Sequence, residues 1–376
     1  MKILMIMPGF FPGKKYGGPP VSIDNFCSLM IGHEKYIITS NHDMGDKEPY
    51  MNISEGWNYR PNVNIKYVSD KEFNNNVFEE AIKEIKPDVV YLQSLFAASS
   101  TLPSLILAKK YHIPVVLAPR GELCKGAFNK KYKKLPYIWL LRMLGLLKHV
   151  TIQSTSEEET CEAAKFLHIN KSRIQLLTNI PSIPSKEAVH ETKQVGTLKI
   201  VFLSRLVSKK NLHSAISYIK GVKGNVEFNI YGPKENQHYW MKCQELIDGL
   251  PSNINVNYCG LVSHSEVHDI FAHHDAFLFP TFSENYGHVI AEALQNGCIP
   301  VISDQTPWTD INQANAGWAI SLDEENKFLS ALNSLAQADE VQMINYRANI
   351  KKYVELKMDL NALREEYTNF FIKSTH

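Results

Sequence analysis

Cysteine is scarce in this chain of 376 residues, and no two cysteines form a Cys-x-x-Cys pair. Disulfide frameworks and zinc sites need cysteines at recurrent short spacings, so the sequence predicts neither. Scattered, reduced thiols are typical of the cytosol, and we expect a cytoplasmic protein. The six positions are Cys27, Cys124, Cys161, Cys243, Cys259 and Cys298.

Long apolar runs are missing as well. The N-terminal run MKILMIMPGFFPG breaks at Pro8-Gly9 and lacks a small-residue cleavage site, so it predicts a first strand rather than a signal peptide. A membrane-spanning helix needs roughly 18 uncharged apolar residues. The nearest candidate, LPYIWLLRMLGLLKHV, is interrupted by Arg142.

Three signatures of nucleotide and metal binding are absent too. The chain has no GxGxxG loop, no Walker loop and no Asp-x-Asp pair. Since no His/Cys cluster replaces the acidic pair, we expect no metal ion. Net charge is only +1, which gives no indication of nucleic-acid binding.

Charge is distributed unevenly along the chain. Residues 1–184 hold 23 Lys and Arg against 17 Asp and Glu, whereas the remainder holds 17 against 22. A basic half is compatible with a domain that faces an anionic surface, and a chance imbalance explains the numbers equally well.

What the sequence does contain is an alternation of short apolar runs with helix-length segments. Such alternation predicts parallel βαβ units, and the length predicts two domains. A stretch rich in Pro, Ser and charge at 179–197 is typical of an interdomain linker. The expected strands are KILMIMP, EKYIITS, VNIKYVS, PDVVYLQS, IPVVLAPRG, HVTIQST and IQLLTNIPS before the linker, and LKIVFLSRL, VEFNIYGP, INVNYCGLV, DAFLFPTF, CIPVISD and GWAISLD after it.

The sequence therefore predicts an α/β fold of two Rossmann-like domains whose parallel sheets face each other across a cleft. We expect the N-terminal domain at 1–184 and the C-terminal domain at 185–355. A C-terminal helix at 356–376 follows, for which packing back on the N-terminal domain is one option. Sheets of this type bind ligands at the carboxyl ends of their strands.

The stretch SENYGHVIAEALQNGCIPVIS holds two glutamates around a glycine. The preceding strand ends at Pro280 and a helix is expected to begin near Tyr286, which leaves Glu284 in the turn. The first N–H groups of that helix are unpaired, and Gly287 would let a ligand approach them. At about 100° per residue, Glu292 lies about 130° from the centre of the apolar stripe, at its border. A solvated turn residue and a helix-surface residue would give the same spacing.

Basic residues follow the strand in FLSRLVSKKNL. Arg205 stands at its end, and Lys209 and Lys210 stand in the loop before the next helix. An arginine fork and a lysine point charge at one strand end suit a diphosphate. A solvated basic loop has the same composition.

The loop after the first strand contains Gly17 and Gly18, in PGFFPGKKYGGPP. Two glycines there would let backbone amides approach a phosphate or a sugar. A flexible loop has the same composition.

A run of lysines precedes an apolar helix that contains Trp139. Basic residues beside such a helix suit an anionic membrane surface. A core helix with a solvated basic start has the same pattern. The lysines are Lys125, Lys130, Lys131, Lys133 and Lys134.

Together these motifs resemble the retaining glycosyltransferases of family 4, which have the GT-B fold, and in particular those of bacterial surface-polysaccharide assembly. FLSRLVSKKNL, FNIYGPKEN and the segment from VNYCGLV to CIPVISD occur in that family's order, and this resemblance covers residues 198–305. The N-terminal half resembles the family more weakly, through MKILMIMPGFFPGKKYGGPP and PDVVYLQS.

The resemblance implies a role for each motif. Glu284 would lie by the transferred sugar, and Glu292 would hold the nucleotide ribose, since a carboxylate accepts hydrogen bonds from vicinal hydroxyls. Arg205 and Lys210 would bind the diphosphate. The other expected donor contacts are at Gly17, Gly18, Gly232, Leu261, Asn285, Tyr286 and Gly287.

One departure from the family concerns the N-terminal domain. Many relatives place a histidine there beside the reacting sugar, whereas the matching strands here end in YLQS and APRGE. Gln93, Arg120 or Glu122 would take that position, on the acceptor or sugar side of the site.

The resemblance predicts an enzyme that moves a hexose or N-acetylhexosamine from a nucleotide diphosphate sugar, with a UDP-sugar favoured, to a hydroxyl of a saccharide or lipid-linked acceptor. Retention of anomeric configuration and metal independence are expected, with the donor as a co-substrate and no cofactor. The setting would be polysaccharide or lipopolysaccharide biosynthesis on the inner face of the membrane. Two alternatives stay open, a GT-B nucleotide-sugar isomerase and a non-catalytic sugar-binding protein.

Overall fold

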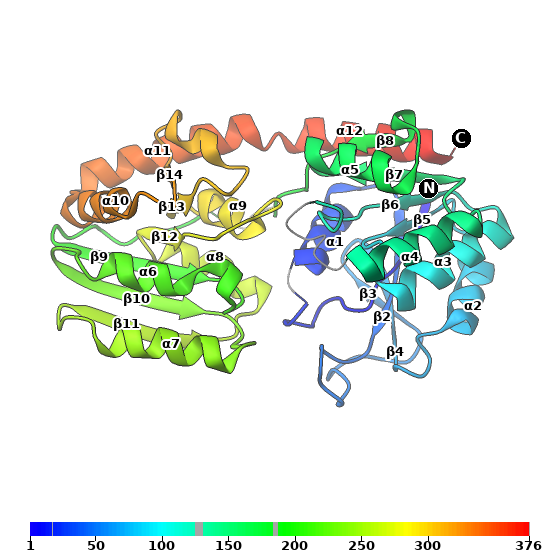
Figure 1. The fold of residues 1–376 in the computed structure, drawn as a ribbon, viewed down its shortest axis with the longest axis horizontal. Helices are drawn as coiled ribbons and strands as arrows, with labels where there is room; N and C mark the ends of the chain where they lie inside the picture. Colours follow the sequence, from blue (N-terminus) through cyan, green and yellow to red (C-terminus); the bar gives the residue numbers. More distant parts are fainter. Residues whose placement is uncertain (17, 125–130, 183–186, 376) are drawn as a thin grey trace. The chain divides into compact units, whose positions relative to one another are not determined.

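Two sheets organise the chain (Figure 1). The structure, a computed structural model, describes residues 1–16, 18–124, 131–182 and 187–375, without the side chains of 131–133. The chain divides into two compact units. Met1–Ile180 and Leu360–His376 form the first, and Pro181–Asp359 forms the second.

The first unit contains an eight-stranded sheet in the order β3-β4-β2-β1-β5-β6-β7-β8. Its neighbours run parallel, except that β3 pairs antiparallel with β4 at the edge. Each apolar run expected as a strand in this half forms one, and the edge strand β3 was not expected. The strands are β1 (Lys2–Ile6), β2 (Glu34–Ser40), β3 (Trp57–Arg60), β4 (Val63–Val68), β5 (Val89–Leu92), β6 (Val115–Leu117), β7 (Val150–Ser154) and β8 (Ile174–Leu176). The helices are α1 (Gly18–Leu29), α2 (Asn75–Ile85), α3 (Ala98–Tyr111), α4 (Lys131–Met143), α5 (Glu157–Leu167), the 3-10 helix η1 (Lys171–Arg173) and α12 (Leu360–Thr375).

Alternation along β1 divides the core of the first unit into two layers. Ile3 and Met5 pack in a cluster with α1 and α12, whereas Leu4 and Ile6 pack on the opposite face with α2. Helices α3, α4 and α5 continue that second face around Val90 (Figure 1). The first unit is therefore a sheet covered by helices on both faces.

The last helix, α12, contributes large side chains to the core of the first unit. Tyr367 and Phe371 are buried, and the ring centroid of Phe371 lies 5.2 Å from that of Phe26 and 5.1 Å from that of Tyr91. The chain leaves the first unit after Ile180 and returns to it at α12.

The second unit contains a six-stranded sheet in the order β11-β10-β9-β12-β13-β14, in which all neighbours run parallel. Each strand expected in this half is confirmed. The strands are β9 (Thr197–Leu203), β10 (Asn225–Tyr231), β11 (Ile254–Gly260), β12 (Ala276–Phe279), β13 (Ile299–Ser303) and β14 (Trp318–Ile320). The helices are η2 (Ser208–Lys210), α6 (Leu212–Ile219), α7 (Gln237–Asp248), α8 (His264–Ala272), α9 (His288–Gln295), η3 (Thr309–Asn312), α10 (Glu325–Gln337) and α11 (Glu340–Lys357).

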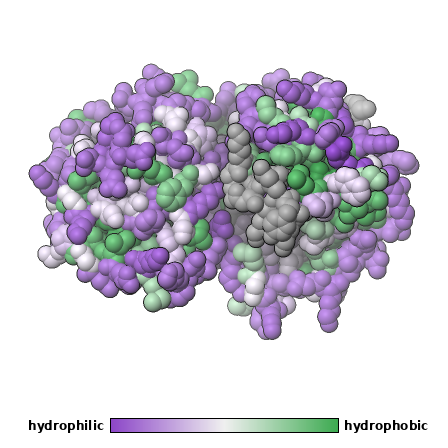
Figure 2. All heavy atoms as spheres, in the orientation of Figure 1, coloured by the Kyte–Doolittle hydropathy of each residue, from purple (hydrophilic) through white to green (hydrophobic). Residues whose placement is uncertain are grey.

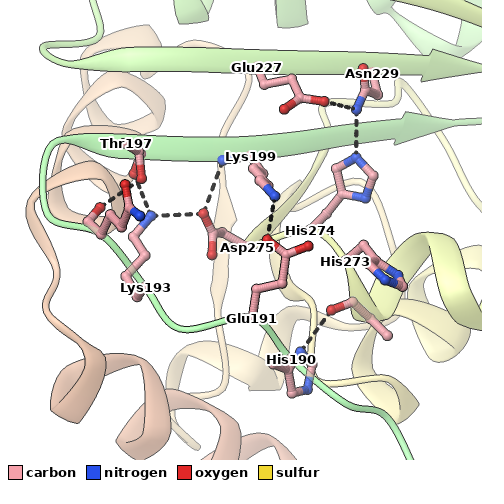
Figure 3. A network of polar contacts seen from close by, with 12 residues as sticks. His190, Glu191, Lys193, Thr197, Lys199, Glu227, Asn229, His273, His274 and Asp275 are labelled. Atoms are coloured by element: carbon pink, nitrogen blue, oxygen red, sulfur yellow. Dashed lines mark hydrogen bonds and ion pairs between the residues drawn. The ribbon is translucent and has the colours of Figure 1, made fainter.

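A buried ion pair ties part of the predicted linker to the amino edge of this sheet (Figure 3). The Lys193 side chain is 2% exposed, and its Nζ lies 2.8 Å from Asp275 Oδ2. The same oxygen accepts a hydrogen bond from the backbone N–H of Lys199 at 3.0 Å, and the Lys199 side chain pairs with Glu191. Over these residues the linker is anchored to the second unit.

Candidate functional site

Four loops meet at the carboxyl edge of the second sheet, because β11, β10, β9 and β12 are parallel neighbours. Residues expected to bind a donor stand in these loops. Arg205 and Lys210 follow β9, Gly232 follows β10, Leu261 follows β11 and Glu284 follows β12. The sheet order thus brings to one edge residues that are far apart in the sequence.

Lys210 and Glu284 form an ion pair between two of these loops. Their side chains are 14% and 13% exposed, so the pair is largely removed from water. Burial lowers the pKa of Lys210, and the charge of Glu284 opposes that effect. The two loops are also joined through the carbonyl of Lys209, which accepts a hydrogen bond from the Phe282 N–H at 3.0 Å. An anion entering beside Lys210 would compete with Glu284 for its charge.

Arg205 stands nearer to water than Lys210. Its side chain is 47% exposed, and its Nη1 lies 3.3 Å from Glu235 Oε2. The charges of Lys209 and Arg205 lower the pKa of Lys210 further, so the three cations lie within electrostatic reach of one another. Such a concentration of positive charge at the carboxyl edge of a sheet suits the binding of a phosphate group.

Glu292 is buried, which corrects its expected position at the border of the helix. Its side chain is 9% exposed, and its Oε1 lies 3.7 Å from His264 Nδ1. Ser182 Oγ donates a hydrogen bond to the same oxygen at 3.2 Å. The helical repeat of α9 could not predict this burial, because the residues that cover Glu292 come from the linker and from the start of α8. Burial raises the pKa of Glu292 to about 7.

The start of α9 also differs from the expectation. The helix begins at His288, later than expected, and its N-cap Gly287 has φ +78°. A Cβ on Gly287 would lie 2.9 Å from Ile290 Cδ1 and 3.5 Å from Trp308 Nε1. The glycine is therefore required by its left-handed backbone and by packing, and not only for the approach of a ligand. The Tyr286 carbonyl, just before it, accepts a hydrogen bond from Trp308 Nε1 at 2.5 Å.

The remaining donor candidates of the second unit lie in the same loops. Gly232 has φ +133°, and a Cβ there would lie 1.8 Å from the carbonyl oxygen of Ser204, so only glycine lets the loops after β9 and β10 touch. Leu261 is 44% exposed. Asn285 and Tyr286 are half-buried between Glu284 and α9.

A cavity of about 290 Å³ lies in the first unit, at the carboxyl ends of β1, β5 and β6. The structure brings together here the three residues expected on the acceptor or sugar side, Gln93, Arg120 and Glu122. Gly18 begins α1, whose prolines at 19 and 20 also line the cavity. Gly17 lies outside the described residues.

Arg120 is held in this cavity by neutral partners. It has φ +54°, an uncommon value for a residue other than glycine. Its Nε and Nη2 donate to Gln93 Oε1 at 3.0 and 2.7 Å, and Nη2 also donates to the Tyr91 hydroxyl at 3.0 Å. Nη1 donates to Asn179 Oδ1. These partners carry no charge, so they do not neutralise the guanidinium, which can therefore attract an anionic or polar group of a ligand.

A chain of buried hydrogen bonds supports Arg120 and was not visible in the sequence. The Tyr91 hydroxyl donates to Gln153 Oε1 at 2.5 Å, and Gln153 Nε2 donates to the Tyr367 hydroxyl at 2.7 Å. The Tyr367 hydroxyl in turn donates to the Thr178 carbonyl at 2.8 Å. The position of Arg120 thus depends on α12, which no local motif signals.

Glu122 is engaged by the loop that leads into α3. Its carboxylate accepts hydrogen bonds from Ser94 Oγ at 2.6 Å and from the Leu95 N–H at 2.8 Å. Burial raises its pKa, and these hydrogen bonds oppose that effect. Glu122 therefore has a structural task in addition to facing the cavity.

The lysine run does not form a uniformly solvated face. Lys134 Nζ donates to the Glu122 carbonyl at 3.1 Å and lies 4.5 Å from the centroid of the Phe96 ring. This lysine is turned inward, which corrects its expected place among the membrane-facing charges. Residues 125–130 and the side chains of 131 and 133 lie outside the description.

A second cavity, of about 310 Å³, lies at the amino edge of the second sheet. Its lysines Lys193 and Lys199 are already paired with Asp275 and Glu191. Sheets of this type bind ligands at the opposite, carboxyl edge, so the carboxyl edge is the candidate site. Across the described ranges, His, Cys, Asp and Glu side chains do not gather in threes that would hold a metal ion.

The family comparison covers the unit that carries Arg205, Lys210, Glu284 and Glu292. Residues 185–356 match the family described as Glycosyl transferases group 1. A Klebsiella pneumoniae protein described as "Uncharacterized 41.2 kDa protein in cps region" is 26% identical to the chain over 274 residues, which are 69% of this chain and 72% of that one.

Solved structures share the fold over nearly the whole chain. Anabaena Alr3699/HepE, solved in complex with UDP and glucose, aligns with a TM-score of 0.71 and 12% identity over 99% of this chain and 100% of that one. WaaG, a glycosyltransferase involved in lipopolysaccharide biosynthesis, aligns with a TM-score of 0.63 and 14% identity over 98% and 99%. The chain thus has the two-sheet α/β fold of GT-B glycosyltransferases, and its residues 185–356 match the glycosyl transferases group 1 family.

Proposed function

We propose that the chain transfers a hexose or N-acetylhexosamine from a nucleotide diphosphate sugar, a UDP-sugar in the first instance, to a hydroxyl of a saccharide or lipid-linked acceptor, with retention. The observation that carries the proposal is the half-buried Lys210–Glu284 pair at the carboxyl edge of the matched domain. The neighbours support the setting, since WaaG acts in lipopolysaccharide biosynthesis and the Klebsiella relative lies in a cps region.

The ion pair suggests how the donor would be received. The diphosphate would replace Glu284 as the partner of Lys210, with Arg205 as a second cation. Glu284 would then be free to accept hydrogen bonds from the hydroxyls of the transferred sugar. Fixed cations stabilise the charge that builds on the departing diphosphate, so they favour the breaking of the glycosidic bond.

Glu292 would bind the nucleotide ribose. Two vicinal hydroxyls donating to its carboxylate would replace the water that burial has removed. Burial raises its pKa, and hydrogen bonds donated by the ribose hydroxyls would favour its ionised form.

The cavity of the first unit would receive the acceptor. Arg120 offers a fixed positive charge there, and Gln93 orients it through two hydrogen bonds. A polar or anionic group of the acceptor beside the reacting hydroxyl would suit this charge.

A donor screen tests the proposal. The purified chain is incubated with UDP-, GDP- and ADP-sugars, and NMR follows the nucleotide and the sugar. We expect release of free nucleotide diphosphate and a first-formed sugar with the anomeric configuration of the donor. Lys210→Met should strongly slow this release, and Lys242→Met, on the exposed face of α7, should not. Conversion to another nucleotide sugar without release would indicate an isomerase, and binding without any turnover would indicate a sugar-binding protein.

A further inference from the structure

Two loops at the carboxyl edge of the second sheet are joined by hydrogen bonds, because β12 and β13 are adjacent parallel strands. The turn after β12, residues 280–287, carries Glu284, and the loop after β13, residues 304–308, has the sequence DQTPW. The side chain of Glu284 is held by Lys210, and its backbone is held by the loop after β13.

Two of these hydrogen bonds secure the beginning and the middle of the turn. At the end of β13, Ser303 Oγ donates to the Thr281 carbonyl at 2.5 Å, and both residues are fully buried. The Glu284 N–H donates to the Gln305 carbonyl at 3.1 Å. A buried polar group is costly to leave unpaired, so these contacts fix the backbone up to Glu284.

Trp308 holds the end of the turn. Its Nε1 donates to the Tyr286 carbonyl at 2.5 Å, and the centroids of the two rings lie 5.4 Å apart. The indole is 3% exposed, so it lies beneath the surface of the second unit, whose visible face is largely hydrophilic (Figure 2). A Cβ on Gly287 would lie 3.5 Å from the same Nε1, so the indole also packs against the N-cap of α9. Ser303, Gln305 and Trp308 thus form a clamp on the turn.

The loop that carries the clamp is itself braced. Thr306 Oγ1 accepts a hydrogen bond from the Trp308 N–H and donates one to the Ser303 carbonyl, each at 3.4 Å. On α11, the ring centroid of Tyr353 lies 6.5 Å from that of Trp308, and the Tyr353 hydroxyl donates to Asp310 Oδ1 at 2.7 Å. The clamp therefore rests on a support that does not depend on the turn it holds.

We propose that Trp308 is a positioning residue for the transfer reaction, and that the clamp keeps Glu284 in place after its ion pair with Lys210 has broken. This inference rests on the proposed function, in which the donor diphosphate takes Lys210 as its partner. Before the donor binds, Glu284 is held both through its carboxylate and through its N–H. Once the diphosphate has taken Lys210, the backbone contacts remain to hold the carboxylate at the transferred sugar. A small misplacement of a reacting or orienting group lowers the rate of a step far more than it lowers binding.

Kinetics and calorimetry with UDP test the proposal. Trp308→Phe keeps an aromatic ring and removes the Nε1–H, so it should lower kcat at least about tenfold and change the Kd of UDP less than about twofold. In the Glu284→Ala background the same substitution should cause no further loss of kcat, because residues that act as a unit are not additive. An equal loss in both backgrounds would show that Trp308 acts on general stability alone, and it would overturn the proposal.

A second variant and a control cover the case in which Trp308→Phe does not fold. Ser303→Ala removes one oxygen atom from the clamp and should also lower kcat without weakening UDP binding. Trp318→Phe, in β14, removes an indole that packs on Tyr346 at 5.4 Å and should leave kcat unchanged. Circular dichroism melting shows whether each variant is folded at the assay temperature. Full activity in a folded Ser303→Ala and a folded Trp308→Phe would exclude a positioning role.

Hydrogen exchange tests the clamp without any donor. Lys210→Met leaves Glu284 without its ion pair, as the diphosphate would, and mass spectrometry follows the amides of residues 282–286. Adding Trp308→Phe to Lys210→Met should make these amides exchange at least about tenfold faster, whereas residues 198–203 of β9 should not change. Unchanged exchange at 282–286 would refute the clamp. A wild type that turns over no donor would instead refute the proposed function, so the two failures are distinguished.

Discussion

Replacement of Glu292 by glutamine should stabilise the protein when no nucleotide is added, and the gain in the free energy of unfolding should depend on pH. The native pKa of Glu292 is about 7, against an ordinary value of 4.5, because its side chain is buried. At about 1.36 kcal/mol per pKa unit, the folded carboxylate is disfavoured by about 3 kcal/mol once both states are ionised. The native state binds the extra proton between pH 4.5 and 7, so the free energy of unfolding falls as pH rises through this interval.

Urea unfolding at pH 5 and pH 8 measures the effect. Glu292→Gln cannot titrate, so its stability advantage over the wild type should be larger by about 2–3 kcal/mol at pH 8 than at pH 5. Glu245→Gln, on the exposed surface of α7, serves as the control and should show little difference at either pH. An advantage of Glu292→Gln that is the same at both pH values would refute the argument from burial.

The same carboxylate links nucleotide binding to protons. If ribose hydroxyls donate to Glu292, UDP binds best to the ionised form, and its affinity should rise between pH 6 and pH 8. Calorimetry in buffers of different ionisation enthalpy should then detect proton release near pH 7. Glu292→Gln should weaken UDP binding by about 2 kcal/mol, the order expected for hydrogen bonds to a charged group. Binding without proton release and without pH dependence would remove Glu292 from the nucleotide site.

Three further predictions concern the reaction. Glu284→Ala should lower kcat strongly and leave UDP affinity nearly unchanged, whereas equal and mild effects of Glu284→Ala and Glu292→Ala on both quantities would contradict the assigned roles. Arg205→Ala and Lys210→Ala should each remove about 2–4 kcal/mol of transition-state stabilisation. The corresponding fall in kcat/KM is measured by steady-state kinetics with the donor found in the screen. Transfer should persist in excess EDTA, and an activity that chelation abolishes and magnesium or manganese restores would show that these cations are not sufficient.

The fold could be predicted from the sequence because buried strands carry dense local signals. Runs such as PDVVYLQS and DAFLFPTF are apolar, short and bounded by polar or Pro-containing turns, so each stands out alone. The strand that was not predicted, β3, has the sequence WNYR and is a short edge strand with Tyr59 exposed. It lacks an apolar run and forms by pairing with β4, which its own sequence does not indicate.

For the candidate site, the sequence could predict only which residues follow the end of a strand. Arg205 and Glu284 could each be placed after a strand, but nothing local shows that β9 and β12 are neighbours. The burial of Glu292 depends on Ser182 and His264, which are distant in sequence, and the helical repeat therefore placed it wrongly at the border. The hydrogen bonds around Arg120 likewise come from separate elements and have no sequence pattern.

The return of α12 to the first unit reverses the order in which the two units can be completed during synthesis. Ribosomes add roughly 5–20 residues per second, so the second unit takes on the order of ten seconds to emerge. Throughout that time Phe26 and Tyr91 lack Phe371, which packs against both in the finished core. The unit that is synthesised first is thus finished last. A chimera that exchanges the second unit between relatives would have to keep residues 360–376 matched to the first.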